Sequence, residues 1–286
     1  MPVPIYVTGG AGFLGGTLVT LLRARNRNVI PVGRSSRSLP GYIQVKSYGD
    51  LSPPTGAVLV HLAESNNIAQ AEGKGSIHVE QVLGVCRALL GKPWGVSFYA
   101  SSAVVYGDRS DHPCRPDDPL PDAVQFYQQG KLACEAEFLR RGGSVGRFAN
   151  LIGPGMSGRN VLSDIITQLQ ADGPLSIADD TPVRDFLHVE DAARGIIAIL
   201  EAPDEIIRGR VFNFGSGIGT RIGDLVALTL SRAGQGDRRV SVRDPAGRRS
   251  SLVLDIAPTT AALGWRPRIS LDETISFLIE KSDGKP

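Results

Sequence analysis

The chain has 286 residues, of which 42% are hydrophobic and 21% are charged. This composition is typical of a globular protein with a sizeable core, and the length fits one large domain or two modest ones. Lysine and arginine number 31 against 29 aspartates and glutamates, which gives no support to nucleic-acid or membrane-surface binding, because both need a clustered basic excess.

Strands alternate with helices through the first half of the chain. The run at 57–62 reads as a continuous apolar strand, and 96–100 reads as another buried strand, which is typical of parallel strands covered on both faces. This alternation predicts βαβ units and an α/β fold built on a Rossmann-type, doubly wound parallel sheet. The predicted strands are 5–7, 29–32, 57–62, 96–100 and 145–148, and the predicted helices are 17–25, 79–90 and 126–141.

Beyond Asn150 the regular alternation ends. A glycine-rich loop at 153–158 is followed by shorter and less regular helices, strands and loops. We therefore predict a smaller C-terminal α/β domain packed beside the first. The larger domain is expected to comprise residues 1–150 together with roughly 186–215, and the smaller one residues 151–185 and 216–286.

A glycine-rich turn separates the first strand from the first helix. Gly9, Gly12 and Gly15 have the spacing G-x-x-G-x-x-G. In dinucleotide-binding sheets, such glycines permit a tight turn, a close approach to a pyrophosphate and close helix–strand packing. The N-terminus of the helix that follows then supplies N–H donors to the phosphates, and Phe13 and Leu14 of the turn are also expected at the cofactor. The position of the turn after a strand and before a helix favours a dinucleotide site over a plain turn.

The loop after the second strand bears on the choice of cofactor. An NAD site normally offers Asp or Glu here to the ribose 2′-OH, and residues 33–37 contain neither. Arg34, with Ser35 and Ser36 as further donors, suits a 2′-phosphate. We therefore predict NADP, with NAD as the alternative if these are only solvated loop residues. Asp50 and Leu51 are expected near the adenine.

Tyr127 and Lys131 lie four residues apart and so share one face of a helix. A free tyrosine ionises only near pH 10, and a neighbouring ammonium favours its phenolate, which brings it closer to acid/base chemistry. Ser102 follows a buried strand and is expected at the ligand crevice, where it can donate to a substrate oxygen. Because Tyr-x-x-x-Lys alone is common by chance, the prediction depends on its combination with the glycine turn and Ser102.

The motifs together resemble the extended short-chain dehydrogenase/reductases, in the branch that acts on nucleotide-activated sugars. Each motif is weak or moderate by itself, but their order and spacing cover nearly the whole chain. The matching segments are 8–15, 61–63, 101–107, Tyr127-x-x-x-Lys131-x-x-x-Glu135, 147–150, 153–155, 184–191, 213–217 and 263–267.

The resemblance implies a role for each matching residue. Tyr127 would be the acid/base, Lys131 would hold the nicotinamide ribose, and Ser102 would orient the reacting oxygen. Phe148 would lie near the nicotinamide, and Asn150 would contact the sugar diphosphate. Further positions are expected at the cofactor (Leu62, Ala63, Ala100) and at the substrate (Val104, Tyr106, and Arg248 or Arg249). Core packing is an equal alternative for Val104, and a solvated loop is the alternative for the arginine pair.

Several reactions use this machinery. Ala103 and Val104 follow Ser102 where sugar dehydratases of the family carry Asp-Glu, so elimination of water has no evident acid/base pair. We therefore predict an NADPH-dependent 4-ketoreductase that reduces a 4-keto-6-deoxy nucleotide sugar. The alternatives are a nucleotide-sugar 4-epimerase with bound NAD, and a non-catalytic NADP-binding protein, against which the intact serine, tyrosine and lysine argue.

The family pattern also has two exceptions in this chain. Gln81 stands where a helix asparagine is common, and Glu64 replaces a small residue after His61-Leu62-Ala63. His61 itself is expected to be structural. The three cysteines lack metal-ligand spacing, which predicts reduced thiols, a cytoplasmic protein and no metal site. The resemblance also implies a homodimer, and no apolar run approaches the roughly 18 residues of a membrane helix.

Overall fold

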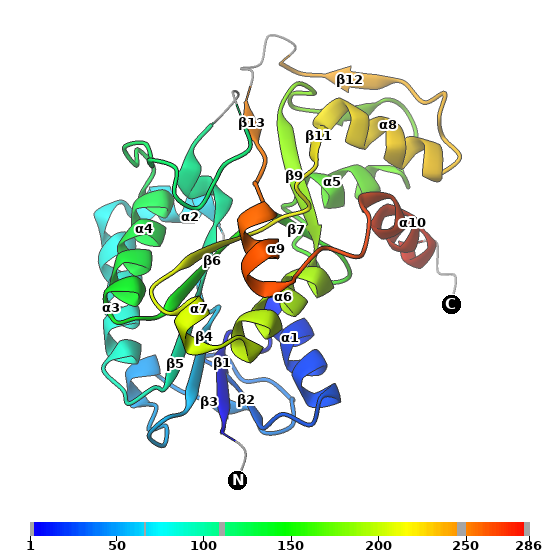
Figure 1. Cartoon of the computed structure of the whole chain (residues 1–286). Helices are drawn as coiled ribbons and strands as arrows, with labels where there is room; N and C mark the ends of the chain where they lie inside the picture. The colour runs from blue at the N-terminus through cyan, green and yellow to red at the C-terminus, as the bar shows by residue number, and fades with distance from the viewer. Residues whose placement is uncertain (1–2, 66, 109–111, 245–249, 283–286) are drawn as a thin grey trace.

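The computed structural model describes residues 3–65, 67–108, 112–244 and 250–282 (Figure 1). Its largest sheet has seven strands, and all neighbouring pairs are parallel. This sheet confirms the predicted α/β, doubly wound class. In spatial order its strands are β10 (Val211–Phe214), β6 (Ser144–Phe148), β5 (Val96–Ser102), β4 (Val58–His61), β1 (Ile5–Thr8), β2 (Val29–Gly33) and β3 (Ile43–Gln44).

The order of the strands reverses at β1, which is where an open sheet is expected to bind a ligand. From β1 the chain first adds β2 and β3 on one side and then crosses to β4 on the other side. Thr8, the last residue of β1, lies between Val32 of β2 and His61 of β4. Open α/β sheets bind ligands outside the carboxyl ends of their strands where the order reverses, and here that point lies between β1 and β4.

Helices cover both faces of the large sheet. Helices α1 (Phe13–Ala24) and α6 (Val189–Glu201) pack on one face, and α3 (Ser76–Leu90) and α4 (Phe126–Arg140) pack on the other. Successive side chains of a strand point to opposite faces. Val7 accordingly lies in the core with α1 and α6, whereas Tyr6 lies in the core with α3 and α4.

All five predicted strands and all three predicted helices are present, but some boundaries differ. The first helix begins at Phe13 rather than residue 17, because Gly12 forms the N-cap and the helix continues through Gly15 and Gly16. Helix α3 begins at Ser76 rather than residue 79. Strand β5 continues to Ser102, and β3 and β10 extend the sheet at its two edges without having been predicted.

A second region lies above the large sheet in the view of Figure 1. It contains a four-stranded sheet, β11-β9-β13 with β7 paired to β9, and a separate β12-β8 pair. A core of its own includes Leu162, Leu225 and Ile275. The strands are β7 (Asn150–Ile152), β8 (Leu175–Ile177), β9 (Val183–His188), β11 (Gly219–Arg221), β12 (Val240–Val242) and β13 (Ser251–Leu252), and the helices are α5 (Val161–Gln168), α8 (Ile222–Arg232) and α10 (Leu271–Ser282).

The remaining elements are short. They are α2 (Ile68–Lys74), α7 (Asp204–Ile207), α9 (Ala257–Leu263) and the 3-10 helices η1 (Tyr48–Asp50) and η2 (Ala103–Tyr106). Over the ranges that the structure describes, no helix combines the length and the apolar character needed to span a bilayer. The division of the chain into cofactor and substrate domains stays a prediction.

Candidate functional site

In the glycine turn between β1 and α1, backbone segments pack closely against one another. Gly9 has a φ of +71°, a conformation that favours glycine. A Cβ on Gly9 would lie 3.1 Å from the backbone of Ala63, and one on Gly15 would lie 2.1 Å from the carbonyl oxygen of Gly9. The turn therefore packs directly against the segment that follows β4, and its first and last glycines leave no room for a side chain.

The start of α1 fits the phosphates of a dinucleotide. Gly12 is the N-cap, with an extended backbone and no side-chain cap hydrogen bond. The first N–H groups of an α-helix have no partner within the helix, so those of Phe13 and Leu14 are available at the positive end of the helix dipole. Leu62 and Ala63 lie beside the turn, because the Leu62 N–H donates to the Thr8 carbonyl oxygen at 3.2 Å.

We expect Gly15→Ala to weaken dinucleotide binding at least tenfold and to lower the free energy of unfolding by about 1–3 kcal/mol, because its methyl group would overlap backbone atoms. Gly16→Ala is the matched control, since a Cβ there meets nothing within 4 Å. It should stabilise the helix by about 0.5–1 kcal/mol and leave binding intact. Titration of NADPH fluorescence and urea unfolding measure both effects, and equal behaviour of the two variants would contradict the prediction.

The loop after β2 exposes the residues predicted to select the cofactor. Arg34, Ser35 and Ser36 are all exposed. Two side chains from the following segment fix the backbone of the loop. Tyr42 OH donates to the Ser35 carbonyl oxygen at 2.6 Å, and Gln44 Nε2 donates to the Arg34 carbonyl oxygen at 3.1 Å. The guanidinium carbon of Arg34 lies 5.9 Å from the centroid of the Tyr48 ring. The loop thus presents a cation and two hydroxyl groups on an ordered backbone.

Asp50 and Leu51, expected near the adenine, lie at the end of the short helix η1 and directly after it. One carboxylate oxygen of Asp50 accepts the Ser47 N–H at 2.9 Å in a capping box, while the residue remains exposed. Leu51 is buried. A contact between Asp50 and an adenine amino group would have to use the rest of the carboxylate, and this contact stays a prediction.

Helix α4 carries the tyrosine–lysine pair on its face toward β5. Tyr127 and Lys131 are both buried, each 6% exposed. Lys131 Nζ donates to the Ala100 carbonyl oxygen at 3.0 Å and lies 5.8 Å from the centroid of the Tyr127 ring. Ser102 ends β5 and caps η2, its Oγ accepting the Val104 N–H at 3.3 Å. The end of β5 therefore brings Ala100 to Lys131 and leaves Ser102 two residues further along the strand.

Glu64, the exception to the family pattern after His61-Leu62-Ala63, contacts Lys131, and this pairing was not predicted from the sequence. Its Oε2 lies 2.7 Å from Lys131 Nζ, and its two oxygens accept from Tyr99 OH at 2.8 and 2.9 Å. Burial by itself would lower the pKa of Lys131, but the Glu64 carboxylate outweighs burial and raises that pKa. The site therefore contains a buried, charged pair. The available signal was the position of Glu64, three residues after the end of β4.

Two more groups approach Tyr127 from helices that precede it in the chain. The ring of His78, on α3, stacks on the Tyr127 ring with centroids 6.5 Å apart and planes 22° apart. Glu72, on α2, accepts the Tyr127 backbone N–H through Oε1 at 3.1 Å. Gln81, the other exception to the family pattern, instead accepts from Lys74 Nζ at 3.2 Å. The surroundings of the tyrosine thus come from α2 and α3, which sequence spacing could not indicate.

The other predicted site residues differ in their surroundings. Phe148 is buried, and its ring stacks on that of Phe214 with the ring centroids 5.0 Å apart. Asn150 is exposed and donates through Nδ2 to the Asp185 carbonyl oxygen at 3.1 Å. Val104 is half-buried, while Tyr106 is fully buried, which is against a role for Tyr106 in lining the sugar pocket. Arg248 and Arg249 lie outside the described residues.

His61, Glu64 and Cys86 offer ligand atoms within 4.8 Å of one another. His61 Nδ1 lies 2.6 Å from Thr8 Oγ1, and burial lowers the pKa of His61 to about 4, so the ring is neutral. A hydrogen bond with Cys134, together with burial, raises the pKa of the Cys86 thiol. Cysteine binds a metal as its thiolate, which the raised pKa of Cys86 disfavours. A metal would also compete with Lys131 for the Glu64 carboxylate. We therefore describe these three residues as a buried polar cluster below the end of β4.

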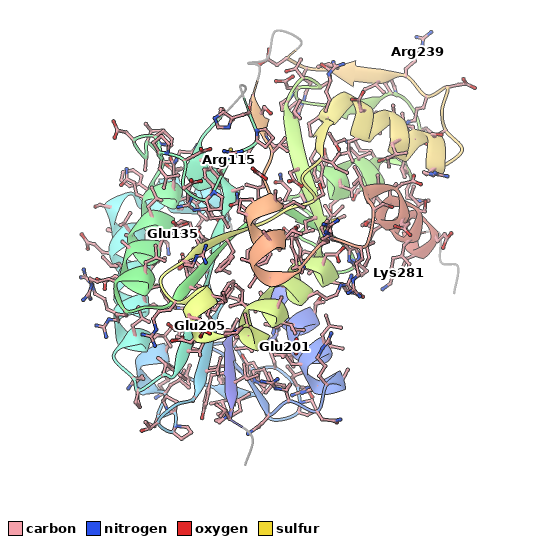
Figure 2. All side chains as sticks on the ribbon, viewed as in Figure 1. Arg115, Glu135, Glu201, Glu205, Arg239 and Lys281 are labelled. Carbon is pink, nitrogen blue, oxygen red and sulfur yellow. The ribbon has the colours of Figure 1, made fainter. Side chains whose placement is uncertain are left out.

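A buried ion pair connects α4 to β6. Glu135, labelled in Figure 2, is on the side of α4 that faces β6. It accepts from Arg147 Nη2 at 2.7 Å and Nε at 3.1 Å, and from Ser101 Oγ at 2.5 Å. The Arg147 guanidinium also lies 4.7 Å from the centroid of the Tyr106 ring. This network connects α4 to the ends of β5 and β6, which fixes the helix that carries Tyr127.

Comparison with known proteins gives independent evidence on the family and the fold of the chain. The model of the NAD dependent epimerase/dehydratase family matches residues 5–215. A dTDP-6-deoxy-L-talose 4-dehydrogenase (NAD(P)(+)) from Kitasatospora kifunensis is 26% identical over 305 residues, covering 97% of this chain and 95% of that protein. A dTDP-L-rhamnose 4-epimerase from Burkholderia thailandensis is 26% identical over 342 residues, covering 96% and 93%. The solved structure of UDP-glucose 4-epimerase from Thermotoga maritima, with UDP-glucose, superposes with a TM-score of 0.85 at 23% identity, covering 99% of each chain.

Proposed function

Because the chain belongs to the NAD dependent epimerase/dehydratase family, which makes it an NAD(P)-dependent enzyme that modifies nucleotide sugars, we propose that it is an NADPH-dependent 4-ketoreductase. Its substrate would be a nucleotide-linked 4-keto-6-deoxy sugar. The observation that carries the proposal is the exposed loop of Arg34, Ser35 and Ser36, which offers a 2′-phosphate a cation and hydroxyl donors. A related dTDP-6-deoxy-L-talose 4-dehydrogenase is named for use of NAD(P)(+).

Each residue of the site has its own role in the proposed reaction. The glycine turn and the Arg34 loop would hold NADPH, which would supply the hydride for reduction of the ketone carbon. Ser102 donates a hydrogen bond to the carbonyl oxygen, and Tyr127 gives its phenolic proton to that oxygen as it becomes an alkoxide. Lys131 holds the nicotinamide ribose through its ammonium. The product is the alcohol, and the phenolate regains its proton from water.

The other positions complete the proposed site. At the cofactor they are Gly9, Gly12, Phe13, Leu14, Gly15, Asp50, Leu51, Leu62, Ala63, Ala100 and Phe148, and at the substrate Val104, Asn150 and Arg248. We assign cofactor binding to residues 1–150 with roughly 186–215, and substrate binding to 151–185 and 216–286. A homodimer is the assembly that we propose.

Arg34→Ala should weaken NADPH binding by about 10- to 100-fold, which corresponds to the loss of a charge-assisted hydrogen bond. NADH binding should change little, because NADH lacks the 2′-phosphate. Fluorescence titration of each cofactor measures the ratio. Arg27→Ala is the control, since this exposed arginine precedes β2 at the opposite end of the strand. An equal loss of affinity for both cofactors would contradict a role for Arg34 in selection.

A 4-epimerase with bound NAD is the second candidate, favoured by the similarity to a dTDP-L-rhamnose 4-epimerase. The two functions differ in how they treat the cofactor. A reductase exchanges NADPH in every turnover, whereas an epimerase recovers its NAD. Purified protein should therefore be denatured and its supernatant examined for NAD, and UDP-, dTDP- and GDP-linked keto sugars should be tested for oxidation of NADPH. Stoichiometric NAD without NADPH oxidation would favour the epimerase, and no reaction of either kind would favour a binding protein.

A further inference from the structure

The contact between Glu64 and Lys131 is buried, and neighbouring parts of the protein hold the Glu64 side chain in place. The Glu64 side chain is only 9% exposed and the Lys131 side chain 8%. A hydrogen bond from the Glu64 N–H to the Leu62 carbonyl oxygen, at 2.9 Å, folds the chain tightly after β4. Tyr99 OH, from β5, holds the carboxylate from a second side. Glu64 is therefore fixed by its own backbone and by a neighbouring strand, and it reaches a lysine on a third element.

Two of the three N–H donors of the Lys131 ammonium already have partners in the protein. An ammonium has three N–H donors. Within the described ranges, its hydrogen-bonded partners are the Glu64 carboxylate at 2.7 Å and the Ala100 carbonyl oxygen at 3.0 Å. One donor is thus left for a ligand in the crevice. The two contacts also fix the nitrogen at 5.8 Å from the Tyr127 ring, so the ammonium cannot swing toward or away from the phenol freely.

The charge beside Tyr127 depends on this pair. With Glu64 ionised, the charges of Glu64 and Lys131 sum to zero. Without that carboxylate, the Lys131 cation would act on the phenol without compensation from its nearest partner. His78, which stacks on the ring, has its pKa lowered by burial and is neutral at pH 7. Among the residues that the structure describes, other titratable groups around the pair include Glu72 and Lys74 on α2, Cys86 on α3, Cys134 on α4, His61 on β4 and Tyr99 on β5.

We propose that Glu64 is a positioning residue that acts through Lys131: it fixes the ammonium and offsets its charge, so that Tyr127 keeps the proton it must donate to the substrate. This inference rests on the proposed reductase function and explains how the site favours proton donation. An uncompensated cation would favour the phenolate, which is the wrong form for reduction of a ketone.

The test uses Glu64→Gln, which keeps the shape of the side chain and removes its charge. The alkaline limb of the pH profile of kcat for ketone reduction should move to lower pH by about one unit or more. The acid limb of the reverse oxidation should move in the same direction. Glu137→Gln is the matched control, because Glu137 is on the same helix as Lys131 and pairs with Arg87 and Arg140 on its outer side. A merely structural role would lower kcat at every pH and leave both limbs in place.

A second readout does not depend on the substrate. The ultraviolet absorbance of tyrosinate is titrated in proteins with and without Tyr127→Phe, both in the unaltered chain and in the Glu64→Gln variant, and the difference isolates Tyr127. The midpoint should move to lower pH in Glu64→Gln. An unchanged midpoint would overturn the inference even if the enzyme reduces keto sugars. A shifted midpoint without oxidation of NADPH by any keto sugar would support the role of Glu64 and overturn the reductase function.

Discussion

Tyr127→Phe is expected to lower kcat for reduction of the keto sugar by about 100- to 10,000-fold, the usual contribution of a positioned acid. The phenylalanine ring keeps the stacking on His78 and the packing of α4, so the loss should reflect the missing hydroxyl alone. Affinity for NADPH should change little, because Lys131 and the glycine turn are untouched. Steady-state oxidation of NADPH measures kcat, and fluorescence titration measures the affinity.

Tyr6→Phe provides the control for Tyr127→Phe. Tyr6 is also buried, and its ring packs edge-on against Trp94 at 5.5 Å, but it lies within β1 on the face covered by α3 and α4. Removal of its hydroxyl should leave kcat unchanged. Near-normal turnover by Tyr127→Phe would remove Tyr127 from the role of acid. A loss of NADPH affinity equal to the loss of kcat would instead show that the hydroxyl serves mainly to bind the cofactor.

Sequence periodicity and spacing were sufficient for the five central strands of the large sheet, for the glycine turn and for the shared helix face of Tyr127 and Lys131. A short, mostly apolar run bounded by turn residues is typical of a buried strand, and the runs at 57–62 and 96–100 are of this kind. Tyr127 and Lys131 share a helix face because four residues make about one turn. The glycine turn was recognisable because its position between strand and helix matters more than its composition.

The features that escaped prediction depend on contacts between elements distant in the sequence. Glu64 reaches Lys131 from a distant part of the chain, and no periodicity indicates that the turn after β4 lies against α4. His78 approaches Tyr127 only because α3 and α4 pack together on one face of the sheet. The start of α1 was placed too late, because Gly15 and Gly16 are poor helix formers and tertiary packing against the turn overrides that preference.

Arg147→Met is expected to lower the free energy of unfolding by about 3–5 kcal/mol, because it leaves the Glu135 carboxylate buried without its cation. The Arg147 side chain is 5% exposed and that of Glu135 is 4% exposed, so solvent cannot replace the lost partner. Arg140→Met is the control: Arg140 is exposed and pairs with Glu137 on the same helix, and its loss should cost less than about 1 kcal/mol. Urea unfolding measures both variants.

The double variant Glu135→Leu, Arg147→Met separates the cost of an unpaired charge from the value of the pair. If desolvation dominates, removing both charges should recover much of the stability that Arg147→Met loses, because a well-packed apolar pair can replace a buried ion pair. Ser101 Oγ would then lose its acceptor on α4, and the end of β5 that carries Ser102 would be held less firmly. Recovered stability with reduced kcat would show that the network exists to position the helix and strand of the site. A double variant as unstable as Arg147→Met would show instead that the ion pair itself stabilises the fold.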